Sequence, residues 1–132
     1  MNEISFDMIG GTPVVYVKIW SPKKNIYRSM FLTLDTGAAI TTISKDILHI
    51  LGYDTESSNK NRITTASGIE YVSEVTLDRL MLAEFELANV KTYAHTFPQE
   101  CFSDGVIGIN VLSNFDLSIS FKRRILGLTP VN

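Results

Sequence analysis

The first part of the chain alternates apolar and polar residues. Residues 15–19 form one such run, and after a polar turn over residues 21–25 a second run places Met30, Leu32 and Leu34 on one face. A period of two is typical of half-buried strands. The two runs therefore predict a β-hairpin whose second strand ends directly before a carboxylate.

The remaining pattern predicts more strands and one or two short helices. A strand over residues 40–43 should lead into a helix that begins at Ser44 and ends at Gly52. Residues 54–62 are polar and rich in Ser and Asn, which indicates an exposed loop. A short strand is possible before residue 8, a short helix is expected over residues 110–114, and further strands are expected over residues 63–66, 69–72, 75–82, 85–93, 106–108, 115–121 and 125–128. The sequence thus predicts an all-β fold with a single domain over residues 1–132.

Composition fits an ordinary globular domain and argues against a nucleic-acid-binding role. Apolar residues make up 45% of the chain and charged residues 20%, with a net charge of −2. A nucleic-acid-binding protein would carry a basic patch. The densest basic clusters, Lys23-Lys24 and residues 122–124, fall in predicted turns. We therefore expect no nucleic-acid partner.

Nothing in the chain predicts a membrane segment, a cofactor or a metal. The N-terminus opens acidic with no secretory-type apolar run, and no stretch approaches the roughly 20 apolar residues of a membrane span. Cys101 is the only cysteine, so no internal disulfide can form, and a cytoplasmic location is expected. Together with His49 and His95 it fits no zinc-ligand spacing.

The residues with candidate chemistry are Leu34-Asp35-Thr36-Gly37-Ala38. An apolar strand that ends in a carboxylate can present it to a cleft. Gly37 allows a sharp turn and a close approach of backbone or substrate. The Thr36 hydroxyl both donates and accepts hydrogen bonds. Asp, Thr and Gly are also common turn residues, so the motif alone is weak.

Two further features strengthen the interpretation. A second glycine-ended apolar strand, Val106-Ile107-Gly108, lies some seventy residues later and precedes the predicted second helix. Ala66-Ser67-Gly68 contains a dipeptide suited to a tight hairpin turn about thirty residues after Asp35.

In this order and spacing, the motifs resemble those of the retroviral-type aspartic proteases, and more closely their small bacterial single-domain relatives. The resemblance spans about residues 14–128. It implies a closed, barrel-like acid-protease half with a flap hairpin. It also implies that Asp35 is catalytic, that residues 36–38 complete its loop, that residues 66–68 form the substrate-binding flap, and that residues 106–108 brace the loop.

The chain departs from the family pattern at two positions. Ala39 stands where retroviral enzymes usually have an acid, and Ile109 where they usually have an arginine. In the family these two charges pair with each other, so their joint loss leaves neither charge unpaired.

Peptide hydrolysis by this route needs two carboxylates around one water, and this chain has one Asp-Thr-Gly. A two-fold axis through a homodimer would supply the second Asp35. The function expected is a homodimeric aspartic endopeptidase that acts on peptide or protein substrates without metal or cofactor. An inactive retropepsin-like peptide-binding or dimerisation module, and an unrelated β protein in which Asp35 lies in a mere turn, remain open alternatives.

Overall fold

The structure is a computed structural model that describes residues 2–56, 60–65, 68–97 and 103–131. Strands account for most of these residues, as the alternating pattern predicts, and two short helices accompany them. The elements in chain order are β1 Asn2–Ser5, β2 Asp7–Ile9, β3 Thr12–Ser21, β4 Ile26–Leu34, β5 Thr41–Ser44, α1 Lys45–Leu51, β6 Lys60–Thr65, β7 Gly68–Leu82, β8 Phe85–His95, β9 Gly105–Ile107, α2 Ile109–Leu112, β10 Phe115–Ser120 and β11 Ile125–Pro130.

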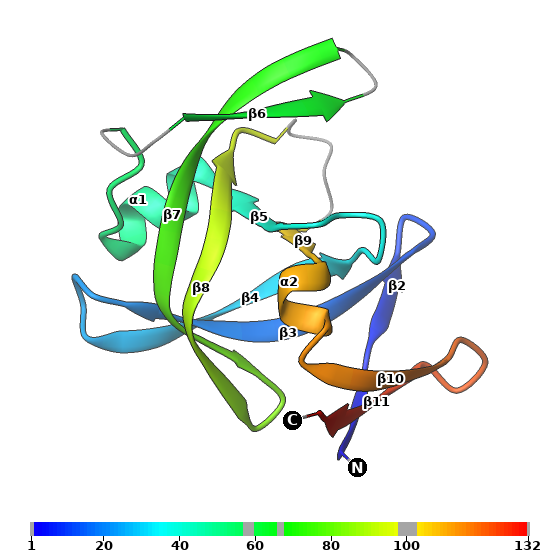
Figure 1. The fold of residues 1–132 in the computed structure, drawn as a ribbon. Coiled ribbons are helices and arrows are strands. Elements are labelled where there is room, and N and C mark those ends of the chain that lie inside the picture. Colours follow the sequence, from blue (N-terminus) through cyan, green and yellow to red (C-terminus); the bar gives the residue numbers. More distant parts are fainter. Residues whose placement is uncertain (1, 57–59, 66–67, 98–102, 132) are drawn as a thin grey trace.

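Eight strands form one sheet in the order β2-β3-β4-β9-β5-β8-β7-β6. The sheet curls until β7 also pairs with β3, with Val17 opposite Leu82 and Ile19 opposite Leu80. The distal part of the β6–β7 hairpin projects beyond this curled body, as Figure 1 shows at the top of the view. The core therefore lies inside the curl, and the hairpin lies at one end of it.

The β3–β4 hairpin confirms the alternating prediction. Met30, Leu32 and Leu34 all point into the core, while Phe31 and Thr33 on the other face are half-buried. Burying a large aliphatic side chain contributes about 1.5–3 kcal/mol, and this fixes which face of each strand is inward. The inward face sets the orientation of the residue that follows β4, which is Asp35.

The short strand β9 is inserted between two strands from the first half of the chain. It runs parallel to β4, with Leu34 opposite Ile107, and antiparallel to β5, with Ile43 opposite Gly105. A side chain at Gly105 would place its Cβ 2.1 Å from the Thr42 carbonyl oxygen. Only glycine fits there, so this residue lets β9 enter the sheet.

The helix α1 follows the sequence prediction closely. Ser44 occupies the position before its first residue, and Gly52 ends it in the left-handed conformation at φ 103°. The Gly52 amide donates to the His49 carbonyl oxygen at 3.0 Å, which satisfies one of the last carbonyl groups of the helix.

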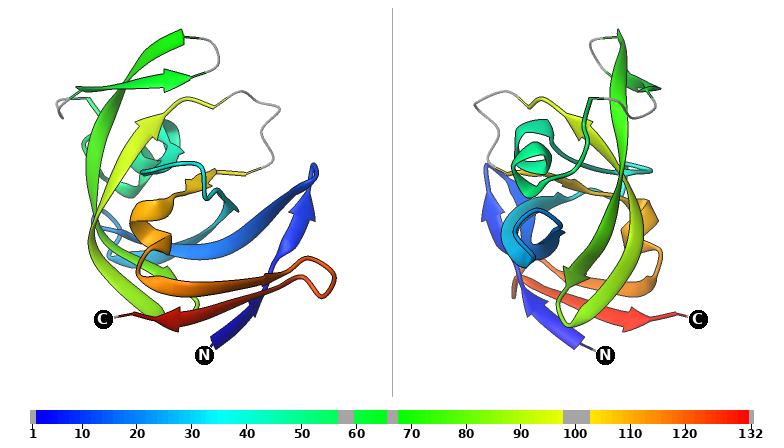
Figure 2. Two further views of the ribbon diagram at one scale, coloured as in Figure 1. Left: turned by 45° about the vertical axis from the view of Figure 1, so that its right-hand side comes forward. Right: turned by 90° about the vertical axis from the view of Figure 1, so that its left-hand side faces the viewer.

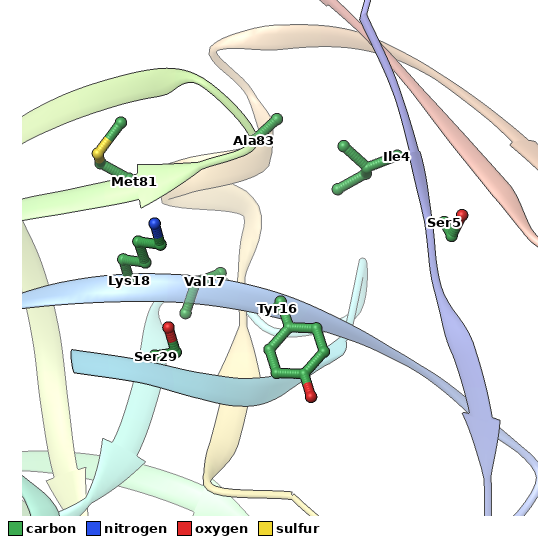
Figure 3. Close-up of a pocket in the computed structure, with 8 residues that line it drawn as sticks. All are labelled: Ile4, Ser5, Tyr16, Val17, Lys18, Ser29, Met81 and Ala83. Atoms are coloured by element: carbon green, nitrogen blue, oxygen red, sulfur yellow. The ribbon is translucent and has the colours of Figure 1, made fainter. Parts of the chain in front are cut away.

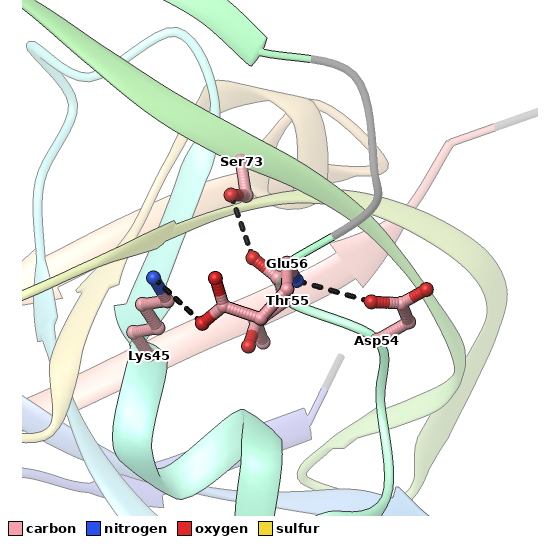
Figure 4. A network of polar contacts seen from close by, with 5 residues as sticks. All are labelled: Lys45, Asp54, Thr55, Glu56 and Ser73. Carbon is pink, nitrogen blue, oxygen red and sulfur yellow. Dashed lines mark hydrogen bonds and ion pairs between the residues drawn. The ribbon is translucent and has the colours of Figure 1, made fainter.

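The prediction that residues 54–62 form an exposed loop is wrong in two respects. Thr55 is buried, and its carbonyl accepts a hydrogen bond from the Ser73 hydroxyl at 2.8 Å. Lys45 Nζ lies 3.0 Å from Glu56 Oε1, so the segment is tied to α1 and to β7 (Figure 4). Strand pairing also begins at Lys60, opposite Ser73. Tertiary contacts thus order a segment whose polar composition suggested a loop.

A separate three-stranded sheet has the order β1-β11-β10. It contains both ends of the described chain and lies opposite the β6–β7 hairpin (Figure 2). Ile4 of this sheet packs against the core. In the part of the chain that the structure describes, no helix has the length and apolar character needed to cross a membrane.

Candidate active site

Asp35 is the first residue after β4, and its backbone is held by the neighbouring strand. Its amide donates to the Ile107 carbonyl oxygen at 3.1 Å. The Gly37 amide donates to Asp35 Oδ1 at 2.9 Å, and the Ala38 amide donates to the Asp35 carbonyl oxygen at 3.3 Å. Asp35 is half-buried, whereas the backbone turn at Thr36 is exposed. The carboxylate is therefore oriented by its own loop and remains accessible.

The glycine at the end of the second signature allows the two signature segments to touch. A Cβ at Gly108 would lie 2.8 Å from the Ala38 carbonyl oxygen and 2.9 Å from the Thr41 amide nitrogen. Real Cβ atoms essentially never approach backbone atoms this closely. Gly108 is thus required by the close approach of β9 to the loop that carries Asp35.

The start of α2 is bonded to the same loop. The Ile109 amide donates to the Ala38 carbonyl oxygen at 2.8 Å, and the Asn110 amide donates to the Ala39 carbonyl oxygen at 3.1 Å. These first amides of the short helix have no partner within the helix itself. The carbonyl groups of the loop therefore accept hydrogen bonds from the first amides of α2, and these bonds hold the loop in place.

A side-chain network completes the brace, and the sequence analysis missed it. Asn110 Oδ1 accepts hydrogen bonds from both the amide and the hydroxyl of Thr41, at 2.8 and 2.9 Å. The Thr41 hydroxyl in turn accepts from the Gly108 amide at 3.0 Å. Asn110 Nδ2 donates to the Lys91 carbonyl oxygen at 2.7 Å. One amide side chain thus joins α2, the end of the loop, and β8.

This brace contains no charge. Ala39 and Ile109 stand in place of the acid and the arginine usual in retroviral enzymes. Both contact the brace through backbone hydrogen bonds, and Ile109 is 40% exposed. Asn110 is the second residue after Gly108, and its side chain can donate and accept at once. A side chain with both a donor and an acceptor, two residues after Gly108, was the sequence signal that could have indicated this bracing role.

Comparison with known proteins supports the grouping of these elements. The family model described as a gag-polyprotein putative aspartyl protease matches residues 27–114, which is more than half of the chain. The chain belongs to this family. The match includes both the Asp35 loop and the Gly108 segment.

A solved structure shows the same retropepsin-like fold. It is a retropepsin-like aspartic protease from Rickettsia conorii, with a TM-score of 0.71 and 21% sequence identity over 96% of this chain and 89% of that chain. No curated protein matches this sequence significantly. The resemblance to small bacterial retropepsin-like proteases that the motifs predict is therefore confirmed in family and in fold.

Asp104 does not supply a second carboxylate to the Asp35 loop. Its Oδ2 accepts a hydrogen bond from the Phe31 amide at 3.0 Å, and its amide donates to the Phe31 carbonyl oxygen at 2.8 Å. Phe31 lies four residues before Asp35 on an extended strand, which corresponds to about 13 Å. Asp104 therefore has a structural partner on β4, far from the Asp35 carboxylate.

The three residues predicted for the flap are only partly described. Ala66 and Ser67 lie outside the described residues. Gly68 begins β7, has a φ of 124° and pairs with Thr65 of β6. The antiparallel pairing of β6 with β7 confirms the predicted hairpin strands.

A pocket of about 340 Å³ lies elsewhere on the protein, between β1, β3, β4 and the turn after β7 (Figure 3). Its lining residues are Ile4, Ser5, Tyr16, Val17, Lys18, Ser29, Met81 and Ala83. None of these belongs to the Asp35 loop. Within the described residues, no group of three or more His, Cys, Asp or Glu side chains is placed to hold a metal ion.

Proposed function

We propose that this protein is an aspartic endopeptidase that acts as a homodimer, with water activated between the Asp35 carboxylates of the two subunits. The observation that carries the proposal is the Asp35 loop, in which the Gly37 amide donates to Asp35 Oδ1 at 2.9 Å. Membership in an aspartyl protease family supports it. The chain has one Asp-Thr-Gly, so a second copy has to provide the second carboxylate.

The proposed reaction follows from two carboxylates that face one water. Two such groups cannot both ionise cheaply at close range, so they share one proton, as is established for dyads of this class. The ionised Asp35 takes a proton from the water, which attacks the scissile carbonyl carbon, while the protonated Asp35 donates to the carbonyl oxygen. Proton return to the leaving nitrogen then breaks the C–N bond of the tetrahedral diol.

The other residues have positioning roles in this proposal. Thr36 would hydrogen-bond its counterpart across the two-fold axis, and the Gly37 carbonyl would bind the substrate backbone. The Ala38 carbonyl oxygen would accept the hydrogen bond from the Ile109 amide at the start of α2. Residues 106–108 would keep the loop in place, and the hairpin around residues 66–68 would close over an extended peptide.

The test is the substitution Asp35→Asn in the full chain, with Asp46→Asn as the matched control because Asp46 is exposed on α1. Cleavage of an unfolded protein substrate is followed by mass spectrometry from about pH 3 to about pH 7. We expect Asp35→Asn to lower turnover by about 10²–10⁴-fold, the range for loss of an acid–base group. The control should cleave at the normal rate.

The dimer is tested on the same preparations by sedimentation. The unmodified protein and Asp35→Asn should both sediment as dimers, and the specific activity should fall on dilution as dimers dissociate. Cleavage that persists in Asp35→Asn, or full activity in a monomer, would refute the proposal.

A second candidate function is a peptide-binding or dimerisation module without catalysis. The exposed Ile109 side chain and the absence of charge at Ala39 favour it, because the usual polar groups beside the loop are missing. Saturable peptide binding with no cleavage at any pH in the tested range would select this function instead.

A further inference from the structure

The first two strands of the chain have different partners, and this leaves a fork between β1 and β3. β2 pairs with β3, with Asp7 opposite Val14, whereas β1 pairs with β11 of the smaller sheet. If the register of β2 and β3 continued, Ser5 would lie opposite Tyr16. Instead β1 turns away, and β7 becomes the next partner of β3. The pocket of about 340 Å³ lies in the fork between the diverging strands (Figure 3).

Two strand edges border this fork without a strand partner. β3 pairs with β2 before Tyr16 and with β7 after it, so among the described residues Tyr16 has no strand partner on this edge. On β1, the Phe6 amide donates to the Arg124 carbonyl oxygen at 3.0 Å, toward β11. Backbone groups of successive strand residues point to opposite edges, so those of Ser5 point away from β11, on the side of the pocket. Such unpaired edges can accept an added strand.

The pocket in the fork combines an apolar lining with an exposed aromatic side chain. The apolar residues of its lining are Ile4, Val17, Met81 and Ala83. Tyr16 lies beside them and is 59% exposed, and its ring centroid lies 3.9 Å from that of Phe31. Tyrosine is frequent among the residues that dominate the binding energy of interfaces. The volume lies at the low end of the range for ligand cavities, so the pocket suits one or two side chains.

One cation borders the pocket. Lys18 lines it, and in the part of the chain that the structure describes no acid lies within ion-pair distance of the Lys18 ammonium group. Met81 lies opposite Lys18, and Glu86 lies opposite Met81, so this acid is two strands away, or about 10 Å. Ser5 and Ser29 add hydroxyl groups to the lining. A positive charge beside apolar surface complements a carboxylate beside an apolar side chain.

We propose that the fork between β1 and β3 is a docking site for an extended peptide segment in which an apolar residue stands next to an acidic one. The segment adds to the free edge of β1 at Ser5, which favours a peptide over a small molecule. Val17 faces the core and Lys18 faces outward. Adjacent residues of an extended peptide also point to opposite faces, so the apolar side chain enters the pocket while its neighbour's carboxylate pairs with Lys18. No lining residue belongs to the Asp35 loop, so docking does not depend on the proposed function.

The probe is a blocked, fluorescein-labelled peptide of sequence Ser-Glu-Leu-Glu-Ser, which places an acid on either side of the apolar residue. It is titrated at neutral pH into the full chain carrying Asp35→Asn, so that cleavage cannot consume it. Replacing the leucine of the probe by serine should weaken binding by about tenfold or more. Replacing both of its acids by glutamine, or Lys18→Gln in the protein, should weaken binding by about two- to fivefold, the range for an exposed ion pair, and the two changes together should add nothing further.

Lys122→Gln is the matched control, because it removes an exposed lysine from the turn between β10 and β11, and it should leave the affinity unchanged. Chemical shift changes of backbone amides on adding the probe should centre on residues 4–5 and 16–18.

Three results would overturn the docking site: no saturable binding, shift changes centred on the Asp35 loop, or equal affinities of the Lys18→Gln and Lys122→Gln proteins. Ser29→Trp fills the pocket from an exposed position on β4 and should abolish binding without changing the sedimentation of the protein. If Ser29→Trp instead turns a dimer into monomers, a second copy of the chain covers the fork and the peptide assignment is wrong. Each of these results leaves the test of Asp35-dependent cleavage untouched, so the two proposals fail separately.

Discussion

The substitution Asn110→Ala tests whether one uncharged side chain holds the candidate active-site loop. It removes both hydrogen bonds from Thr41 to Asn110 Oδ1 and the hydrogen bond from Asn110 Nδ2 to the Lys91 carbonyl oxygen. Thr41 is fully buried, so its amide cannot find water in exchange. The end of the loop at Thr41 should therefore lose the side-chain contact that links it to α2 and β8.

The magnitude follows from what each group loses. A typical internal hydrogen bond contributes about 0.5–1.5 kcal/mol, and a buried donor left without a partner costs about 1–3 kcal/mol. The exposed bond to Lys91 belongs at the low end of the first range. We therefore expect Asn110→Ala to lower the free energy of unfolding by about 3 kcal/mol. Asn110→Asp keeps an acceptor for Thr41 but places a carboxylate oxygen against the Lys91 carbonyl oxygen, so it should cost more than the loss of the Lys91 hydrogen bond alone.

Urea denaturation at one fixed protein concentration measures these values, since dimerisation would otherwise shift the midpoint. Asn114→Ala is the control, because among the described residues Asn114 Nδ2 bonds to carbonyl groups of its own helix turn, those of Asn110 and Val111, and to no other element. With a slope of about 1–3 kcal/mol/M, the Asn110→Ala midpoint should fall by about 1–3 M. A loss no larger than that of Asn114→Ala would refute the reasoning about the brace.

Two other substitutions test contacts near and far from the loop. Gly108→Ala places a Cβ 2.8 Å from the Ala38 carbonyl oxygen, so we expect a loss of about 1–3 kcal/mol in urea denaturation, together with faster amide exchange at Ala38. The second substitution is Tyr53→Phe. Burial raises the pKa of Tyr53 above its ordinary value of 10.0, so the folded state favours the neutral phenol. The hydroxyl donates to the Trp20 carbonyl oxygen at 2.7 Å and accepts from the Asp78 amide at 3.1 Å. This stabilisation is complete below about pH 10 and is lost as the pH rises through the pKa of the folded state. In that range the stability difference between the unmodified protein and Tyr53→Phe should shrink. A constant difference in urea denaturation at alkaline pH would contradict the assignment.

The features that the sequence predicted correctly have local causes. The alternation through Met30, Leu32 and Leu34 selects one face of β4 because the side-chain period of a strand is two. Gly52 ends α1 because the left-handed conformation there suits a residue without a side chain. The hairpin strands β6 and β7 were likewise recognisable from two runs around a short turn. Each of these signals lies within a few residues of the element it specifies.

The features that the sequence did not reveal depend on residues far apart in the chain. Thr55 reads as a loop residue, yet it is buried because Ser73 and α1 close over its segment. Asn110 reads as an ordinary helix residue, and its role exists only because the fold places it beside Thr41, sixty-nine residues earlier.

By itself, then, the sequence determined the strand-rich class, the strand that ends at Asp35 and the glycine that ends the second signature. Only the tertiary structure decided that β9 lies between β4 and β5, that the amide of Asn110 braces the loop, and that β1 leaves β3 to pair with β11. The physical reason is that hydrophobic period and turn preference act along the chain, whereas strand order and polar partners are selected by burial and hydrogen bonding across the whole fold.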